Sequence, residues 1–192
     1  MPNIAVLVSG AGSNLDAILK YRLPVKLVVA DRKCLALQIA MRAKIPVRKF
    51  FRPFTKGFNR ELFTLNMVEQ LRKTDIDLIV MAGFMTLLSP VIYDLYPRRM
   101  LNLHPSLFEI VGGRSVAKYK GAHAPRDALR AGEKVTGCTV HVVEGVDEGR
   151  VLATQEVSIL ETDDEKTLHE RIKLVEHEIY PKAIAEYIQE IF

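Results

Sequence analysis

Asn102 and His104 have the residue types and the spacing that proton transfer and oxyanion stabilisation require. They lie in Met100–Leu107, whose apolar residues predict a short buried strand ending at His104. Side chains alternate between the two faces of a strand, so the amide and the imidazole point the same way. An amide N–H can donate to a developing oxyanion, and an imidazole can move a proton near neutral pH. The structural alternative is that His104 caps a loop and Asn102 bonds to turn backbone.

A glycine-rich turn, Ser9–Asn14, is the second candidate site. It follows an apolar run at Ile4–Val8 and precedes a helical segment that starts at Leu15. Strand, glycine turn and helix together present backbone N–H groups and a helix N-terminus to a phosphate group. Helix capping by Ser13 and Asn14 is the structural alternative.

The same turn partly matches the dinucleotide fingerprint G-x-G-x-x-G. Gly10 and Gly12 fill the first two positions, but Leu15 stands at the third. Asp31 could imitate the acid that binds a ribose, so a nicotinamide enzyme remains an alternative. We expect a single phosphate monoester as the ligand of this turn.

Alternating strand and helix patterns must position these residues. Apolar runs predict strands at 4–8, 25–30, after 47, 77–83 and 100–104, with helical segments at 15–20, 36–43, 59–73 and 90–96 between them. This alternation predicts an α/β fold with an open, mostly parallel, twisted sheet and helices on both faces. Further strands are expected at 137–143 and 151–159, the last of them antiparallel to its predecessor. Ligands bind at the carboxyl ends of the strands in such sheets.

Several segments carry structural expectations only. Leu62, Leu65, Val68 and Leu71 are spaced as a core-facing helical stripe. The aromatic and basic stretch 50–58 is expected to be a loop over the sheet edge. His141 is interpreted as a hydrogen-bonded strand histidine.

Three further expectations concern loops and helix ends. Residues 108–124 are expected to be an irregular, mobile lid over His104. Ser89 should cap a helix that Pro90 begins. A capping box at 162–165 should open the final helix, which Pro181 should interrupt.

Composition narrows the class of protein. The 192 residues suit one domain, 1–192, and 48% hydrophobic with 26% charged residues is ordinary for a globular chain. The net charge of +4 is spread along the chain and would suit an anionic small molecule as well as nucleic acid. Because the chain has no dense Lys/Arg run and no zinc-finger spacing, no nucleic-acid partner is expected. No apolar run approaches the ~18 residues of a membrane span, so no membrane partner is expected. The distant Cys34 and Cys138 and the lack of a signal peptide indicate a reduced, cytoplasmic location.

Seven stretches together resemble one family. They are Val8–Asn14, Ala82–Met85, Leu101–Leu107, Gly121–Ala124, Gly137–His141, Gly145–Asp147 and Glu176–His177. Over nearly its whole length the chain is similar to the phosphoribosylglycinamide formyltransferases, folate-dependent enzymes of purine biosynthesis. The resemblance implies a Rossmann-like formyltransferase fold, small-molecule substrates and 10-formyltetrahydrofolate as co-substrate, with no metal. A homodimer is an expected assembly.

The resemblance also implies residue roles. Asn102, His104 and Asp147 would be catalytic. The ribotide substrate would contact Gly12, Ser13, Asn14 and Glu176. The folate would contact Met85, Thr86, Leu87, Leu88, Asn102, Glu144, Gly145, Val146 and Asp147.

Such a site fits the chemistry of formyl transfer. An amine attacks the formyl carbon, and Asn102 and protonated His104 donate to the oxyanion that forms. Asp147 beside the imidazole would favour its charged form. Neither a metal nor a covalent intermediate is needed.

The chain departs from the family pattern at four places, and other functions stay open. The segment 108–118 is longer than usual, and the turn before Asp147 is one residue short. Thr86 stands where arginine is common, and Arg150 where proline is common. The alternatives are a formyltransferase for another amine, a formyl-folate hydrolase, and a folate- or nucleotide-binding module without catalysis.

Overall fold

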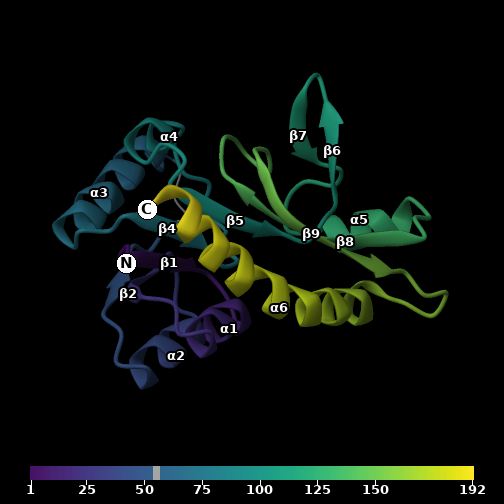
Figure 1. Cartoon of the computed structure of the whole chain (residues 1–192), viewed down its shortest axis with the longest axis horizontal. Coiled ribbons are helices and arrows are strands. Elements are labelled where there is room, and N and C mark those ends of the chain that lie inside the picture. Colours follow the sequence, from purple (N-terminus) through teal and green to yellow (C-terminus); the bar gives the residue numbers. More distant parts are fainter. Residues whose placement is uncertain (54–56) are drawn as a thin grey trace.

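A seven-stranded sheet forms the centre of the molecule in the computed structural model, which describes residues 1–53 and 57–192 (Figure 1). In chain order its strands are β1 (Ile4–Val8), β2 (Val25–Ala30), β3 (Val47–Lys49), β4 (Leu78–Met81), β5 (Met100–His104), β8 (Val135–Val142) and β9 (Val151–Ser158). The spatial order is β3-β2-β1-β4-β5-β8-β9. The first five are parallel, and β5–β8 and β8–β9 are antiparallel. The predicted α/β fold is confirmed, and the direction already reverses at β8.

Helices cover both faces of the sheet, as predicted. They are α1 (Ser13–Lys20), α2 (Ala36–Arg42), α3 (Arg60–Lys73), α4 (Val91–Leu95), α5 (Ala124–Arg130) and α6 (Glu165–Ile191). One apolar core lies between the sheet and α1, α2 and α6, and a second lies between the sheet and α3 and α4. Every residue of β1 is fully buried because each faces one of these two cores.

The buried face of α3 differs from the expected stripe. Val68 and Leu71 are buried, but 54% of Leu62 and 39% of Leu65 is exposed. Thr64 and Met67 are buried in their place. The helix is therefore rotated toward its Thr64 side, where the hydroxyl accepts the backbone N–H of Ser89 at 2.9 Å. The predicted capping by Ser89 is wrong, because the N-cap of α4 is Pro90 and no side chain caps this helix.

Residues 108–117 form a hairpin and not an irregular loop, which corrects this part of the expectation for 108–124. Residues 118–123 carry no helix or strand, as expected. Strands β6 (Phe108–Val111) and β7 (Arg114–Ala117) pair antiparallel and project from the body of the molecule (Figure 1). Gly112 and Gly113 join them with φ of 57° and 78°. Two residues with positive φ suit the right-handed twist of a two-residue hairpin turn.

Helix α6 runs through Pro181 without a break, so the predicted interruption is wrong. Pro181 lacks a backbone N–H, but it is buried, and Ile172 before it and Ile184 after it pack into the same core. Tertiary burial on both sides outweighs the lost backbone bond. The capping box also lies later than expected, because Asp164 and Thr167 form it.

The aromatic stretch at 50–58 is described at its two ends. Phe50 and Phe58 both pack edge-on against Phe63 of α3, with ring centroids 6.3 Å and 5.4 Å away. The middle of the expected edge loop, residues 54–56, lies outside the described residues.

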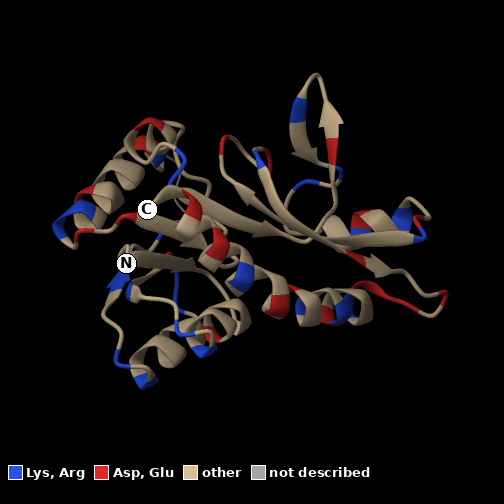
Figure 2. Cartoon of the chain, viewed as in Figure 1, with Lys and Arg blue, Asp and Glu red and all other residues tan. Residues whose placement is uncertain are grey.

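Charge is mixed over the surface. Lys and Arg alternate with Asp and Glu along α6 and are spread over the other helices and loops (Figure 2). In the part of the chain that the structure describes, no helix has the length and apolarity to cross a membrane.

Candidate active site

Asn102 and His104 lie on the same face of strand β5, toward its carboxyl end. β5 lies between β4 and β8, and the register places Asn102 opposite His141 and His104 opposite Thr139. His104 is only 4% exposed, while Asn102 is partly exposed. The predicted pairing of an amide and an imidazole at the carboxyl end of a parallel strand is therefore present.

Asn102 is oriented by His141. The Nδ1 of His141 lies 3.1 Å from the carbonyl oxygen of Val142, so Nδ1 carries the proton and donates it. The Nε2 is then an acceptor, 3.2 Å from the amide nitrogen of Asn102. Burial lowers the pKa of His141 to about 4, which keeps the ring neutral at physiological pH. One N–H of the Asn102 amide is thus used, and the second can donate to another group.

Both ring nitrogens of His104 face acceptors. Nδ1 lies 3.2 Å from a carboxylate oxygen of Asp147, and Nε2 lies 2.7 Å from the carbonyl oxygen of Tyr119. A neutral imidazole has one N–H, so only the imidazolium donates both bonds. The two contacts hold the ring from both sides, and the carbonyl oxygen of Tyr119 occupies Nε2.

Asp147 is held by a second donor. The backbone N–H of Gly121 donates to its other carboxylate oxygen at 2.8 Å. Burial alone would raise the pKa of Asp147, but the bonds from His104 and Gly121 outweigh it and the pKa lies below its ordinary value. Asp147 is consequently ionised at neutral pH and pairs with His104.

A cavity of about 650 Å³ collects most of the predicted residues. It is lined by the glycine turn, the loop after β4, the end of β5, the segment before α5 and one face of α6. The predicted residues among its lining are Gly12, Ser13, Asn14, Met85, Leu87, Asn102, His104, Val146, Asp147 and Glu176. The glycine turn and the Asn102–His104 edge thus face one space.

The shape of the glycine turn requires glycine at position 12. Its φ is 85°, and a Cβ there would lie 2.7 Å from the Cα of Ala36. Gly12 is also the N-cap of α1, with no side chain bonded across the helix end. The Ser13 and Asn14 side chains are therefore not used for capping, in contrast to the structural alternative.

Asn14 and Glu176 join the turn to α6. The amide nitrogen of Asn14 donates to Glu176 at 3.0 Å, while its own side-chain oxygen is buried without a partner among the described residues. Glu176 is 4% exposed, and burial raises its pKa although the bond from Asn14 acts in the opposite direction. The pair offers an unfilled acceptor and a buried carboxyl group to a ligand.

Two further residues of α6 line the cavity and were missed from the sequence. His169 and Lys173 precede Glu176 by seven and three residues, so the three side chains share one helix face. This spacing was a usable signal once Glu176 was singled out. Lys173 and Lys120 both line the cavity and supply positive charge to it.

A smaller cavity of about 90 Å³ adjoins the first beside the loop after β4. Its walls are mainly apolar and include Leu88 and Gly145, and it shares Asn102, Val146 and Asp147 with the larger one. Predicted Thr86 also lines it. Glu144 lies elsewhere, in a pocket between the hairpin and β9, so the structure does not bring it to the two cavities.

Asp31 is used inside the protein and does not line either cavity. It is 1% exposed, accepts the Thr86 hydroxyl at 2.7 Å, and is bonded twice by Arg32 at 2.9 and 3.0 Å. A ribose-binding role for Asp31 therefore has no support. Within residues 1–53 and 57–192, no cluster of three or more His, Cys, Asp and Glu could hold a metal ion.

Known proteins share this architecture. The family model described as "Formyl transferase" matches residues 2–184. Phosphoribosylglycinamide formyltransferase of Mycobacterium tuberculosis is 38% identical over 188 residues, covering 95% of this chain and 83% of the relative. The trifunctional purine biosynthetic protein adenosine-3 of Drosophila melanogaster is 39% identical over 193 residues, and the match spans 95% of this chain but 14% of that protein.

A solved structure supports the same relationship. The crystal structure of phosphoribosylglycinamide formyltransferase from Bacillus halodurans superposes with a TM-score of 0.86 at 34% identity, covering 97% of this chain and 95% of the other. The match of fold and sequence extends over the cavity and all seven strands of the sheet. The chain belongs to the formyl transferase family.

Proposed function

We propose that the protein transfers the formyl group of 10-formyltetrahydrofolate to the amine of 5'-phosphoribosylglycinamide, a step of purine biosynthesis. The observation that carries this proposal is the convergence of Asn102, His104 and Asp147 on the cavity that the glycine turn also faces. Similarity to phosphoribosylglycinamide formyltransferases over most of the chain supports the choice of substrates.

The ribotide fits the end of the cavity formed by α1 and α6. Backbone N–H groups of Gly12 and Ser13 at the start of α1 can bind the phosphate, and the ammonium of Lys173 adds a charge contact. Asn14 at the end of this turn and Glu176 of α6 are bonded to each other and line the same cavity, so their oxygens can accept bonds from the ribose or the glycinamide. The amine would then point toward Asn102.

The folate fits the opposite end. Thr86, Leu87 and Leu88 of the loop after β4 line one wall of the smaller cavity, and Gly145 and Val146 line another. Met85 of the same loop lines the larger cavity. A flat heterocycle with polar edges is suited to such a slot because the walls bury its faces and the backbone bonds its edges. Its formyl group would lie beside Asn102 and Asp147.

The reaction follows from this placement. The amine nitrogen forms a bond to the formyl carbon, and the carbonyl oxygen becomes an oxyanion. The free N–H of Asn102 donates to that oxygen, and loss of such a donor costs about 10²–10³ in turnover in comparable sites. The oxyanion then collapses, the bond from the carbon to the folate nitrogen breaks, and a proton moves from the amine to that nitrogen.

His104 is the residue that can stabilise the oxyanion and carry the proton, directly or through water. Asp147 holds the ring through Nδ1, so Nε2 is the nitrogen that meets the substrate. In this structure Nε2 is bonded to the Tyr119 carbonyl. Productive binding therefore requires the segment at Tyr119 to move away from His104.

A cytoplasmic location and a homodimer belong to the same proposal. The two free cysteines, Cys34 and Cys138, support a reducing compartment. The homodimer stays a prediction that sedimentation velocity of the purified protein tests.

Purified protein given 10-formyltetrahydrofolate and phosphoribosylglycinamide provides the test. We expect formylated ribotide together with tetrahydrofolate in equal amounts. Tetrahydrofolate with free formate would indicate a hydrolase, and tight folate binding without either product would indicate a binding module. Either result contradicts the proposal.

A further inference from the structure

The β6–β7 hairpin is bonded to the turn that carries Asp147. Residues 144–149, named here the Asp147 turn, connect β8 to β9. The backbone N–H of Ala117 donates to the Asp147 carbonyl at 2.9 Å, and the N–H of Gly149 donates to the Ser115 carbonyl at 3.0 Å. These two bonds make Val116 and Glu148 an antiparallel bridge pair. Strand β7 thus lies alongside the Asp147 turn as an additional strand.

The Asp147 turn needs support because its backbone is strained. Asp147 has a φ of 53°, which lies in the left-handed region that residues with a side chain adopt only at a cost in free energy. The ends of the turn are anchored by the N–H of Val142 to the Arg150 carbonyl and that of Glu144 to the Glu148 carbonyl. Among the described residues, the main chain of Asp147 itself is bonded only by Ala117.

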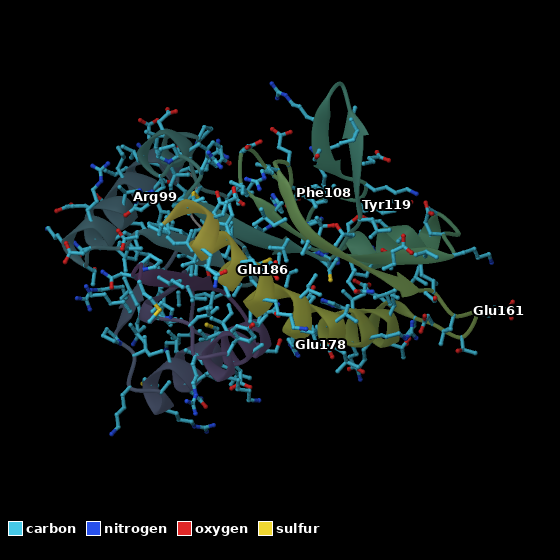
Figure 3. All side chains as sticks on the ribbon, viewed as in Figure 1. Arg99, Phe108, Tyr119, Glu161, Glu178 and Glu186 are labelled. Atoms are coloured by element: carbon cyan, nitrogen blue, oxygen red, sulfur yellow. The ribbon has the colours of Figure 1, made fainter. Side chains whose placement is uncertain are left out.

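The base of the hairpin also contacts both histidines of the site. Phe108 lies at the base of the hairpin (Figure 3). The centroid of its ring lies 4.8 Å from that of His141 and 6.2 Å from that of His104. His141 orients the Asn102 amide, and His104 pairs with Asp147. The hairpin therefore contacts His141, which orients Asn102, and the Asp147 turn, whose carboxylate pairs with His104.

We propose that the β6–β7 hairpin is a positioning element of the active site, which holds the Asp147 turn so that its carboxylate meets His104. Phe108, Ser115 and Ala117 are its positioning residues, since each acts through another group and none reaches the reacting atoms. The inference deepens the proposed function and rests on it for the consequence in catalysis. The contact between hairpin and turn is testable without substrate.

Residues 108–117 can be removed without a gap. The N–H of Lys118 donates to the Leu107 carbonyl at 2.9 Å, and the same bond would close a two-residue turn if two residues replaced 108–117. Replacing 108–117 by Asn-Gly therefore keeps Leu107 and Lys118 paired. It deletes the two backbone bonds of Ser115 and Ala117 to the Asp147 turn and the ring contacts of Phe108. Ile110→Thr at the hairpin tip, where the side chain is 71% exposed, is the matched control.

The first readout is the titration of the Asp147 carboxyl followed by carbon NMR in the free protein. In the unchanged protein and in Ile110→Thr we expect a pKa below the ordinary value, because His104 and Gly121 donate to the carboxylate. In the deletion we expect it to return toward the ordinary value. The expected kcat falls roughly 10- to 100-fold, because a misplacement near 1 Å has that effect, while KM for the ribotide stays unchanged.

The proposal is overturned if the deletion protein has the same Asp147 pKa and the same kcat as the unchanged protein. If the deletion does not fold, hydrogen exchange of the unchanged protein decides. Protected amides at Ala117 and Gly149 are expected, and rapid exchange at both contradicts the proposal. Ala117→Pro, which removes one donor and leaves the hairpin, should reproduce the Asp147 shift. If the unchanged protein transfers no formyl group, the titration and exchange results still stand and only the proposed function fails.

Discussion

Replacing Thr86 with valine removes one hydrogen bond from a buried carboxylate and changes little else. The Thr86 hydroxyl donates to Asp31 at 2.7 Å, and both residues are 1% exposed. Valine has nearly the same shape, so packing is retained. A hydrogen bond to a charged group contributes about 1.5–3 kcal/mol, and Arg32 keeps its two bonds to the same carboxylate. We therefore expect Thr86→Val to lower the free energy of unfolding by about 2 kcal/mol at pH 7.

The effect should depend on pH. Burial raises the pKa of Asp31, but the bonds from Arg32, Thr86 and Ser9 outweigh it, so the folded value lies below the ordinary 3.8. A carboxyl group with a lowered folded pKa stabilises the protein above its unfolded pKa, and this contribution is lost as pH falls through the folded pKa. The difference between Thr86→Val and the unchanged protein should accordingly shrink below pH 3.8.

Urea denaturation at pH 7 and pH 3 measures this difference. Thr86→Ser is the control, because it keeps the hydroxyl and loses a methyl group, which costs about 1 kcal/mol at either pH. Equal stability of Thr86→Val and the unchanged protein at pH 7 would refute the reasoning. So would a loss of the same size at both pH values.

Three further predictions concern the cavity. Gly12→Ala should lower the free energy of unfolding by about 2 kcal/mol or more in urea denaturation, because φ is 85° and the Cβ would meet Ala36; unchanged stability would contradict this. Lys173→Met should raise KM for the ribotide roughly tenfold with kcat unchanged, as expected for loss of a charged phosphate contact, and an unchanged KM in steady-state kinetics would exclude that contact. His141 should titrate near pH 4 in nitrogen NMR, because burial lowers its pKa. The unfolded state then binds a proton at higher pH than the folded state, so the free energy of unfolding should decrease as pH is lowered from 6.5 to 4. A titration midpoint near 6.5 would show that the ring is not buried as described.

The sheet and the site edge could be predicted from the sequence because their signals are local. Apolar runs identify β1, β2, β4 and β5, and strand periodicity places Asn102 and His104 on one face. The glycine turn can also be predicted from the sequence, because only glycine suits the positive φ of residue 12 and its close approach to Ala36. These features need no knowledge of distant contacts.

Other features depend on tertiary contacts that the sequence does not display. Pro181 stays helical because the residues around it are buried, and the face of α3 is set by the bond between Thr64 and Ser89. The position of Glu144 follows from the hairpin, which was interpreted as an irregular lid. The hairpin has one local signal, the Gly-Gly pair at 112–113, which favours a two-residue turn between the segments 108–111 and 114–117.

Single-turnover formyl transfer by His104→Ala and Asp147→Asn tests the central claim most directly. Formylated ribotide is measured by mass spectrometry after mixing enzyme in excess with the ribotide and 10-formyltetrahydrofolate, and circular dichroism confirms the fold of each variant. We predict folded proteins whose transfer rate falls by about 10²-fold or more, because the imidazolium and its carboxylate partner are lost. Near-normal transfer by either folded variant would contradict the assignment of that residue to the reaction.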